Sequence, residues 1–135
     1  MQSVASVNDE MPSSVEGFSY PGADQVFEER GIKLKRGDGR LLFVECSTAY
    51  DVMVESLAGR AGYCFKATGK HGFLTMELAG AYHIWTEGHP VRAKLTAEGE
   101  TTTVDVPKNA FRPVGEADST TGRKRSVLVE LRITG

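Results

Sequence analysis

The fold of this chain depends most on residues 62–85, which read GYCFKATGKHGFLTMELAGAYHIW. Two runs rich in aromatic and β-forming residues flank the turn at residues 69–72, and a third such run follows at residues 81–85. Strand-like runs joined by a short glycine-containing turn are typical of antiparallel pairs. We therefore expect a β-hairpin with a third strand close behind it.

Hydrophobic patterning predicts further strands on both sides of this stretch. Ile32 and Leu34 alternate with lysines, the Gly-Asp-Gly sequence at residues 37–39 predicts a hairpin turn, and residues 40–46 form the expected partner strand. Because that run is apolar on both faces, we expect it to be a central strand buried on both sides. In the closing strand at residues 126–134, alternation predicts one inward face, which consists of Val127, Val129, Leu131 and Ile133.

The whole pattern is that of an all-β protein. About nine strands at spacings of about ten residues, without a βαβ rhythm, predict an antiparallel β-sandwich, either jelly-roll-like or immunoglobulin-like. One short N-terminal helix is expected at residues 23–30, with Gly31 as its stop, and it should plug one end of a sheet. Residues 1–19 are polar and predict a flexible arm, so residues 20–135 make up a single β-sandwich domain.

Composition limits the classes of function. Sixteen basic and eighteen acidic residues give a formal charge of -2, which disfavours a nucleic-acid partner. No apolar run approaches the roughly 20 residues that a membrane-spanning helix needs, so no membrane span is expected. The N-terminus shows no signal-peptide pattern, which leaves either a cytosolic protein or the mature form of a secreted one.

The two cysteines, Cys46 and Cys64, both lie in strand-like runs. Two unrelated buried thiols are one explanation, because free cysteine is often buried. A single disulfide in an exported protein is the explanation that we favour. The sequence thus predicts a Cys46–Cys64 bridge and secretion to the extracellular space.

The faces of the strand that contains Cys64 are ambiguous. Cys64 alternates with Lys66 and Thr68, whereas Tyr63 and Phe65 point to the other side. Either Cys64 faces the core and the two aromatic residues are exposed, or a β-bulge near Gly62 changes the register.

Three segments carry a resemblance to a known group of proteins: residues 20–24 (YPGAD), residues 31–39 (GIKLKRGDG) and residues 64–78. They are similar to segments of small secreted actinobacterial β-domain proteins of unassigned function. The resemblance covers residues 20–132 and includes no catalytic motif. It implies export and a single β domain, and it implies no activity.

The most suggestive site residues are Trp85 and His83, which share one face of the strand at residues 82–85. Trp85 is either the largest residue of the core, as its size favours, or an exposed side chain that stacks on a sugar or anchors a protein partner. His89 joins the two if the turn at residues 87–88 folds back. The histidine spacings match no zinc pattern, so neither a metal nor another cofactor is expected.

No catalytic motif is present: there is no Gly-x-Ser-x-Gly sequence, and the disulfide would leave no cysteine nucleophile. We therefore expect a non-enzymatic, secreted binding module whose ligand is an extracellular glycan or protein, with the binding residues Trp85, His83 and His89. A protease inhibitor that presents residues 47–63 as a disulfide-tethered loop is an alternative. A small hydrolase is a further one.

Overall fold

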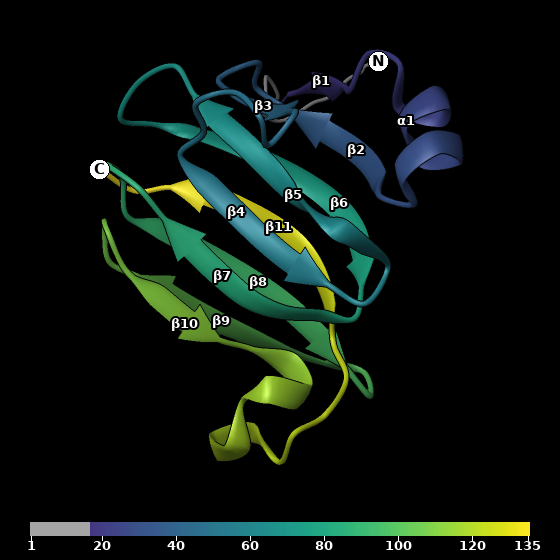
Figure 1. Cartoon of the computed structure of the whole chain (residues 1–135), viewed down its shortest axis with the longest axis vertical. Helices are drawn as coiled ribbons and strands as arrows, with labels where there is room; N and C mark the ends of the chain where they lie inside the picture. The colour runs from purple at the N-terminus through teal and green to yellow at the C-terminus, as the bar shows by residue number, and fades with distance from the viewer. Residues whose placement is uncertain (1–16) are drawn as a thin grey trace, which may run out of the picture.

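The computed structural model describes residues 17–135, which form two antiparallel β-sheets packed face to face (Figure 1). The larger sheet has the order β1-β2-β6-β11-β8-β9, and the smaller sheet has the order β10-β7-β4-β5-β3. The predicted antiparallel β-sandwich with one short helix is thus confirmed. The strands of the larger sheet are β1 (Phe18–Ser19), β2 (Lys33–Gly37), β6 (Gly72–Ala79), β11 (Val127–Ile133), β8 (Val91–Ala97) and β9 (Glu100–Val106). Those of the smaller sheet are β10 (Phe111–Pro113), β7 (Ala81–Thr86), β4 (Val52–Ser56), β5 (Gly59–Ala67) and β3 (Leu41–Val44).

The hairpin predicted within residues 62–85 is wrong. Strand β5 belongs to the smaller sheet and β6 to the larger sheet, so the turn between them carries the chain across the sandwich. The chain crosses back between β6 and β7. A glycine-containing turn suits a crossover as well as a hairpin, and each strand has an apolar face to bury against the opposite sheet. The adjacent pairs β4–β5 and β8–β9 are the hairpins instead.

The hairpin predicted around residues 37–39 is also wrong, because β2 and β3 lie in different sheets. The Asp38 carboxylate holds this crossover in place: its Oδ1 accepts hydrogen bonds from the backbone N–H of Arg40 at 3.0 Å and of Phe73 at 3.2 Å. Strand β3 is an edge strand rather than a central one, and Leu42 on it is exposed. The strand is rich in apolar residues because Tyr20 of the N-terminal segment and Arg30 of the helix that follows cover part of it at Phe43.

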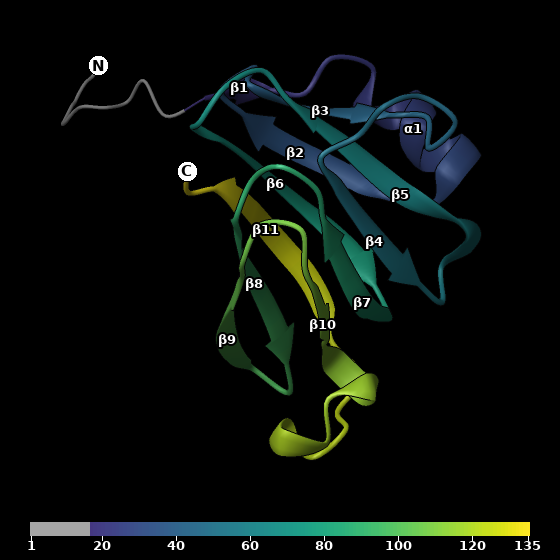
Figure 2. The same ribbon diagram turned by 60° about the vertical axis from the view of Figure 1, so that its left-hand side comes forward.

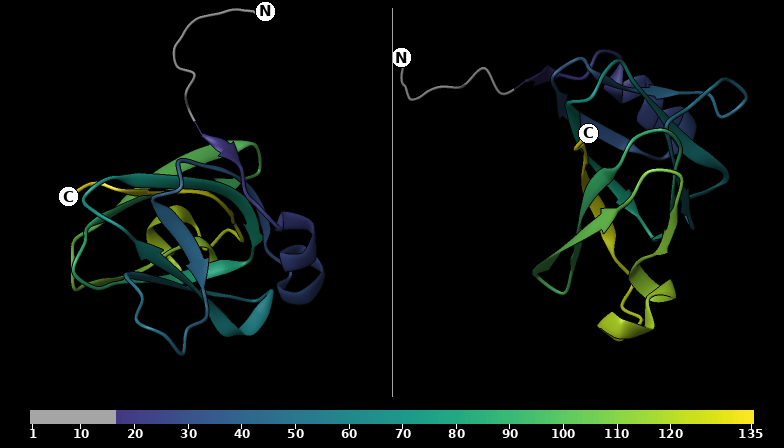
Figure 3. Two further views of the ribbon diagram at one scale, coloured as in Figure 1. Left: turned by 90° about the horizontal axis from the view of Figure 1, so that it is seen from above. Right: turned by 90° about the vertical axis from the view of Figure 1, so that its left-hand side faces the viewer.

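That covering segment includes the helix α1 (Ala23–Arg30), which ends as predicted at Gly31 in the left-handed conformation with φ 77°. The carbonyl of Arg30 accepts a hydrogen bond from the buried Tyr63 hydroxyl at 2.5 Å, and the Tyr20 hydroxyl accepts one from Phe43 N–H on β3 at 2.9 Å. Residues 20–30 therefore close the end of the sandwich at which β2 and β3 separate (Figure 3). Of the predicted arm, residues 1–16 lie outside the described residues, and β1 pairs with β2.

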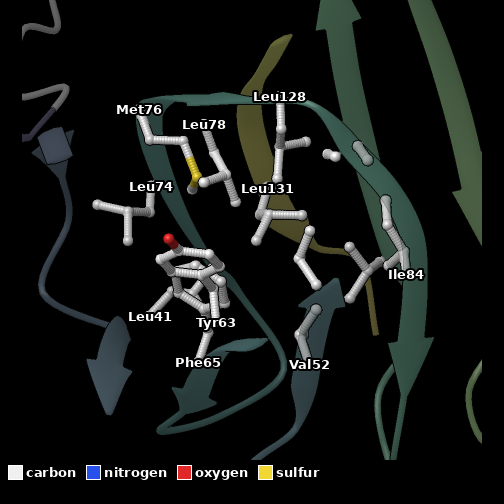
Figure 4. Close-up of a cluster of buried hydrophobic side chains, with 14 of the residues drawn as sticks. Leu41, Val52, Tyr63, Phe65, Leu74, Met76, Leu78, Ile84, Leu128 and Leu131 are labelled. Carbon is white, nitrogen blue, oxygen red and sulfur yellow. The ribbon is translucent and has the colours of Figure 1, made fainter. Parts of the chain in front are cut away.

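The core lies between the two sheets and settles the ambiguity around Cys64. Tyr63 and Phe65 point inward and are fully buried together with leucines from the opposite sheet (Figure 4). The pairing of β4 with β5 shifts beyond Val54, and Gly62 has the positive φ of 78° there. This irregularity is the bulge that the sequence allowed, and the alternative with exposed Tyr63 and Phe65 is wrong.

A second bulge changes the closing strand β11. Its pairing with both neighbours shifts between Leu128 and Glu130, so that Leu128, Leu131 and Ile133 are buried while Val129 is only half-buried. The predicted strict alternation from Val127 to Ile133 is therefore wrong in its first half. Within residues 17–135, no helix is long and apolar enough to cross a membrane.

Candidate ligand-binding site

The candidate site lies on the outward face of the smaller sheet, away from the core. Strand β7 turns Ile84 into the core and both His83 and Trp85 outward. Trp85 is 39% exposed, so it is a surface residue and not the largest residue of the core. The neighbouring strands β4 and β10 supply the other side chains of the site.

Phe111 on β10 lies directly opposite Trp85 in the strand pairing. The ring centroids of Trp85 and Phe111 are 4.4 Å apart with an angle of 40° between the planes, and His83 contacts Phe111 edge-on at 4.8 Å. Phe111 is itself 39% exposed. The site therefore presents a partly exposed aromatic surface built from two strands. Phe111 was not predicted from the sequence as a site residue because its strand has only three residues.

Glu55 on β4 connects the two residues of β7. Its Oε1 accepts a hydrogen bond from Trp85 Nε1 at 2.8 Å and is 2.9 Å from His83 Nδ1. Because a carboxylate only accepts, Nδ1 must carry the hydrogen, and Nε2 of neutral His83 is then a hydrogen-bond acceptor. The bonds from Trp85 and His83, and the charge of His83 when protonated, hold the pKa of Glu55 below its ordinary value despite partial burial.

We refer to Glu55, His83, Trp85 and Phe111 as the aromatic site. It continues a row of side chains across four adjacent strands, because Cys64, Met53, Trp85 and Phe111 are successive cross-strand partners. At a spacing of about 4.8 Å between strands, this row is about 14 Å long. A shallow depression of about 450 Å³ lies beside Trp85 and Phe111, and residues 86–87 and 109–110 complete its lining.

His89, the third predicted binding residue, has a different neighbour. Its Nδ1 is 2.8 Å from the carbonyl oxygen of Gly135, close to the C-terminus. The structure thus brings His83 and Trp85 together and gives His89 no contact with the aromatic site. Glu55 was not predicted as a site residue either, because its strand pairs with β7 only in the folded sheet.

The cysteines form the predicted disulfide, Cys46–Cys64, with 5.2 Å between their Cα atoms. The segment that it tethers is largely the β4–β5 hairpin, which lies within the smaller sheet. In the part of the chain that the structure describes, no three metal-ligating side chains come together.

The hydrogen bond between Glu55 and Trp85 predicts a pH-dependent fluorescence signal. Since folding lowers the pKa of Glu55, its carboxylate stabilises the folded state above the unfolded pKa of about 4.3, and this contribution is lost as the pH falls through the folded value. Protonation weakens the bond from the indole of Trp85, the only tryptophan. We therefore expect a change in tryptophan emission whose midpoint lies below the ordinary pKa of a glutamate side chain.

Two variants check this assignment. In Glu55→Gln the side chain no longer titrates, so the emission should stay constant over this pH range. Glu77→Gln is the matched control, because the pKa of Glu77 is also lowered, but by Lys35 on the other sheet. An acid transition that persists in Glu55→Gln would contradict the assignment.

This architecture defines a small, disulfide-bonded, two-sheet β domain with an aromatic surface on one sheet. A solved structure with a similar fold is the antifungal protein from Streptomyces tendae Tu901, determined by NMR. The TM-score is 0.51 at 12% sequence identity, and the match covers 69% of this chain and 98% of that chain. At this identity the likeness concerns the fold alone. No family model and no curated protein matches the sequence.

Proposed function

We propose that this protein is a secreted, non-catalytic binding module that holds a glycan on its aromatic site. The observation that carries the proposal is the outward pair Trp85 and Phe111, bordered by the Glu55 carboxylate and His83. An exposed aromatic pair on a rigid sheet is a surface that soluble proteins keep mainly for binding.

The polar groups of the site favour a ligand that is rich in hydrogen-bond donors. Trp85 Nε1 is occupied by Glu55, whereas Glu55 Oε2 has no hydrogen bond within residues 17–135. Together with Nε2 of neutral His83, the site thus offers two acceptors beside an aromatic plane. A sugar ring supplies an apolar face for the plane and hydroxyl hydrogens for the acceptors. The Glu55 charge disfavours acidic glycans, so we expect neutral or amino-bearing ones.

The direction of the pKa shift of Glu55 argues against one catalytic role, that of a general acid. A carboxyl that acts as a general acid needs a raised pKa, whereas that of Glu55 is lowered. The row through Met53, Trp85 and Phe111 is long enough for more than one sugar ring and suits a chain that crosses the strands. Secretion is supported by the disulfide, which persists in oxidising compartments, and is compatible with the neighbour's description as an antifungal protein.

The test is retention of the whole chain on neutral, amino-bearing and acidic polysaccharides. We expect saturable binding to a neutral or amino-bearing polymer. Trp85→Ala and Phe111→Ala should each weaken it by about 30-fold or more, as expected for central binding residues. Phe27→Ala is the matched control, because Phe27 is an exposed aromatic residue on α1 and should not change binding.

Equal retention of Trp85→Ala and the unmodified chain would contradict the aromatic site. If the chain is retained on immobilised proteins but on no glycan, the ligand is a protein and the glycan proposal is wrong. Turnover of a saccharide by the unmodified chain would contradict the absence of catalysis.

A further inference from the structure

Strand β9 forms an edge of the larger sheet and is a second surface, besides the aromatic site, that is suited to binding. Strand β9 has seven residues and pairs only with β8, so its other edge is open (Figure 2). The two strands join through the turn at Glu98 and Gly99, with φ values of 53° and 81°, and Ala97 faces Glu100 across it. A two-residue hairpin of this kind makes the flanking pair a hydrogen-bonded one.

Alternation along the strand then determines which backbone groups face outward. Glu100, Thr102 and Val104 are hydrogen bonded to β8, whereas Thr101, Thr103 and Asp105 direct their N–H and C=O groups to the open edge. Among the described residues, no other segment is hydrogen bonded to these outward groups. The edge is therefore a ready template for another strand.

The other sheet edges are protected, which distinguishes β9 from them. Strand β1 has two residues, β3 has four, and β10 has three that include Pro113. On β3, the N–H of Phe43 is also bound by the Tyr20 hydroxyl. Strand β9 contains none of the lysines or prolines with which natural edge strands block pairing.

We propose that β9 pairs antiparallel with β9 of a second copy of this chain, about a two-fold axis at Thr103. In this register the two Thr103 residues exchange backbone hydrogen bonds, and each Thr101 does so with Asp105 of the other copy. Thr102 then lies opposite Val104, and Glu100 opposite Val106. No two like charges face each other, and each Asp105 meets a threonine hydroxyl. This self-complementarity identifies a second copy as the occupant.

The expected association is weak. Edge pairing of one seven-residue strand buries less than the roughly 1,000 Å² of a stable interface. We expect a dissociation constant on the order of 10⁻⁴ M, hence mostly monomer at micromolar and mostly dimer at millimolar concentration. The aromatic site lies on the other sheet, and none of its residues belongs to β9.

Amide hydrogen exchange of the full chain, with sedimentation equilibrium, from about 10 μM to 1 mM tests this proposal. The amides of Thr101, Thr103 and Asp105 should become protected as the concentration rises. Those of Thr102 and Val104 should be protected throughout, because they bond to β8. Exchange of the first three that does not depend on concentration would overturn the proposal. A chain that is still monomeric at 1 mM would also overturn the proposal. The same holds if the amides of β9 become protected only when a peptide of different sequence is added.

Substitution at the two-fold axis provides the second arm. Thr103→Pro removes an outward N–H, a change that edge strands tolerate, and should abolish the dimer. Thr103→Val keeps the N–H and should retain it. If circular dichroism shows Thr103→Pro to be unfolded, Thr103→Lys replaces it, because two lysines would then face each other. A dimer that persists in the folded Pro variant, or in the Lys variant, would overturn the proposed register.

Discussion

Replacement of both Cys46 and Cys64 by alanine is expected to lower the free energy of unfolding by about 3 kcal/mol. The bridge closes a loop with a sequence separation of 18, and it joins the segment after β3 to the outward face of β5. Without it, the unfolded chain gains the freedom of that loop. For a chain of 135 residues, the melting temperature should fall by about 10 °C.

Thermal unfolding with and without reductant measures this effect. Reductant should destabilise the unmodified chain toward the value of the double variant and leave the double variant unchanged. Two labelled thiols after alkylation without reductant would contradict both the bridge and the main physical argument for export.

The disulfide and the aromatic site lie on the same sheet. The disulfide lies on the outward face of the smaller sheet, in the cross-strand row that continues through Met53 to Trp85. It therefore ties the segment that follows the edge strand β3 to its neighbour β5, two strands away from Trp85. We expect ligand retention in the double alanine variant to weaken less than in Trp85→Ala, because no atom of the aromatic site is removed.

Local features of the fold could be predicted from the sequence. The end of α1 at Gly31 and the shared face of His83 and Trp85 both follow from backbone preferences and strand periodicity. The pairing of the two cysteines also agreed with the prediction. Each of these depends on neighbours within a few positions, or on the only available partner.

The pairing of strands could not be predicted in the same way. A turn such as residues 69–72 fits a hairpin or a crossover equally well, and the choice depends on which sheet each strand joins. The bulges near Gly62 and Val129 shift the alternation without a decisive local signal. Glu55 and Phe111 joined the site only because β4 and β10 both lie next to β7.

Two adjacent residues on β7 should respond in opposite ways to truncation, because the strand points them to opposite faces. Ile84 is fully buried between the sheets, so Ile84→Ala leaves a cavity and should cost about 2–5 kcal/mol of unfolding free energy. Trp85 is 39% exposed. Trp85→Ala loses the hydrogen bond to Glu55 and the contact with Phe111, together about 1–2 kcal/mol at this partly exposed position.

Binding should follow the reverse order. Ile84→Ala, measured well below its melting temperature, should retain a polysaccharide nearly as well as the unmodified chain, whereas Trp85→Ala should lose retention. In the unmodified protein, iodide should quench the emission of Trp85, since the indole is accessible to solvent. A collapse of stability in Trp85→Ala, together with emission that iodide does not quench, would place the indole in the core and contradict the aromatic site. Intact retention in Trp85→Ala would locate the binding surface elsewhere on the sandwich.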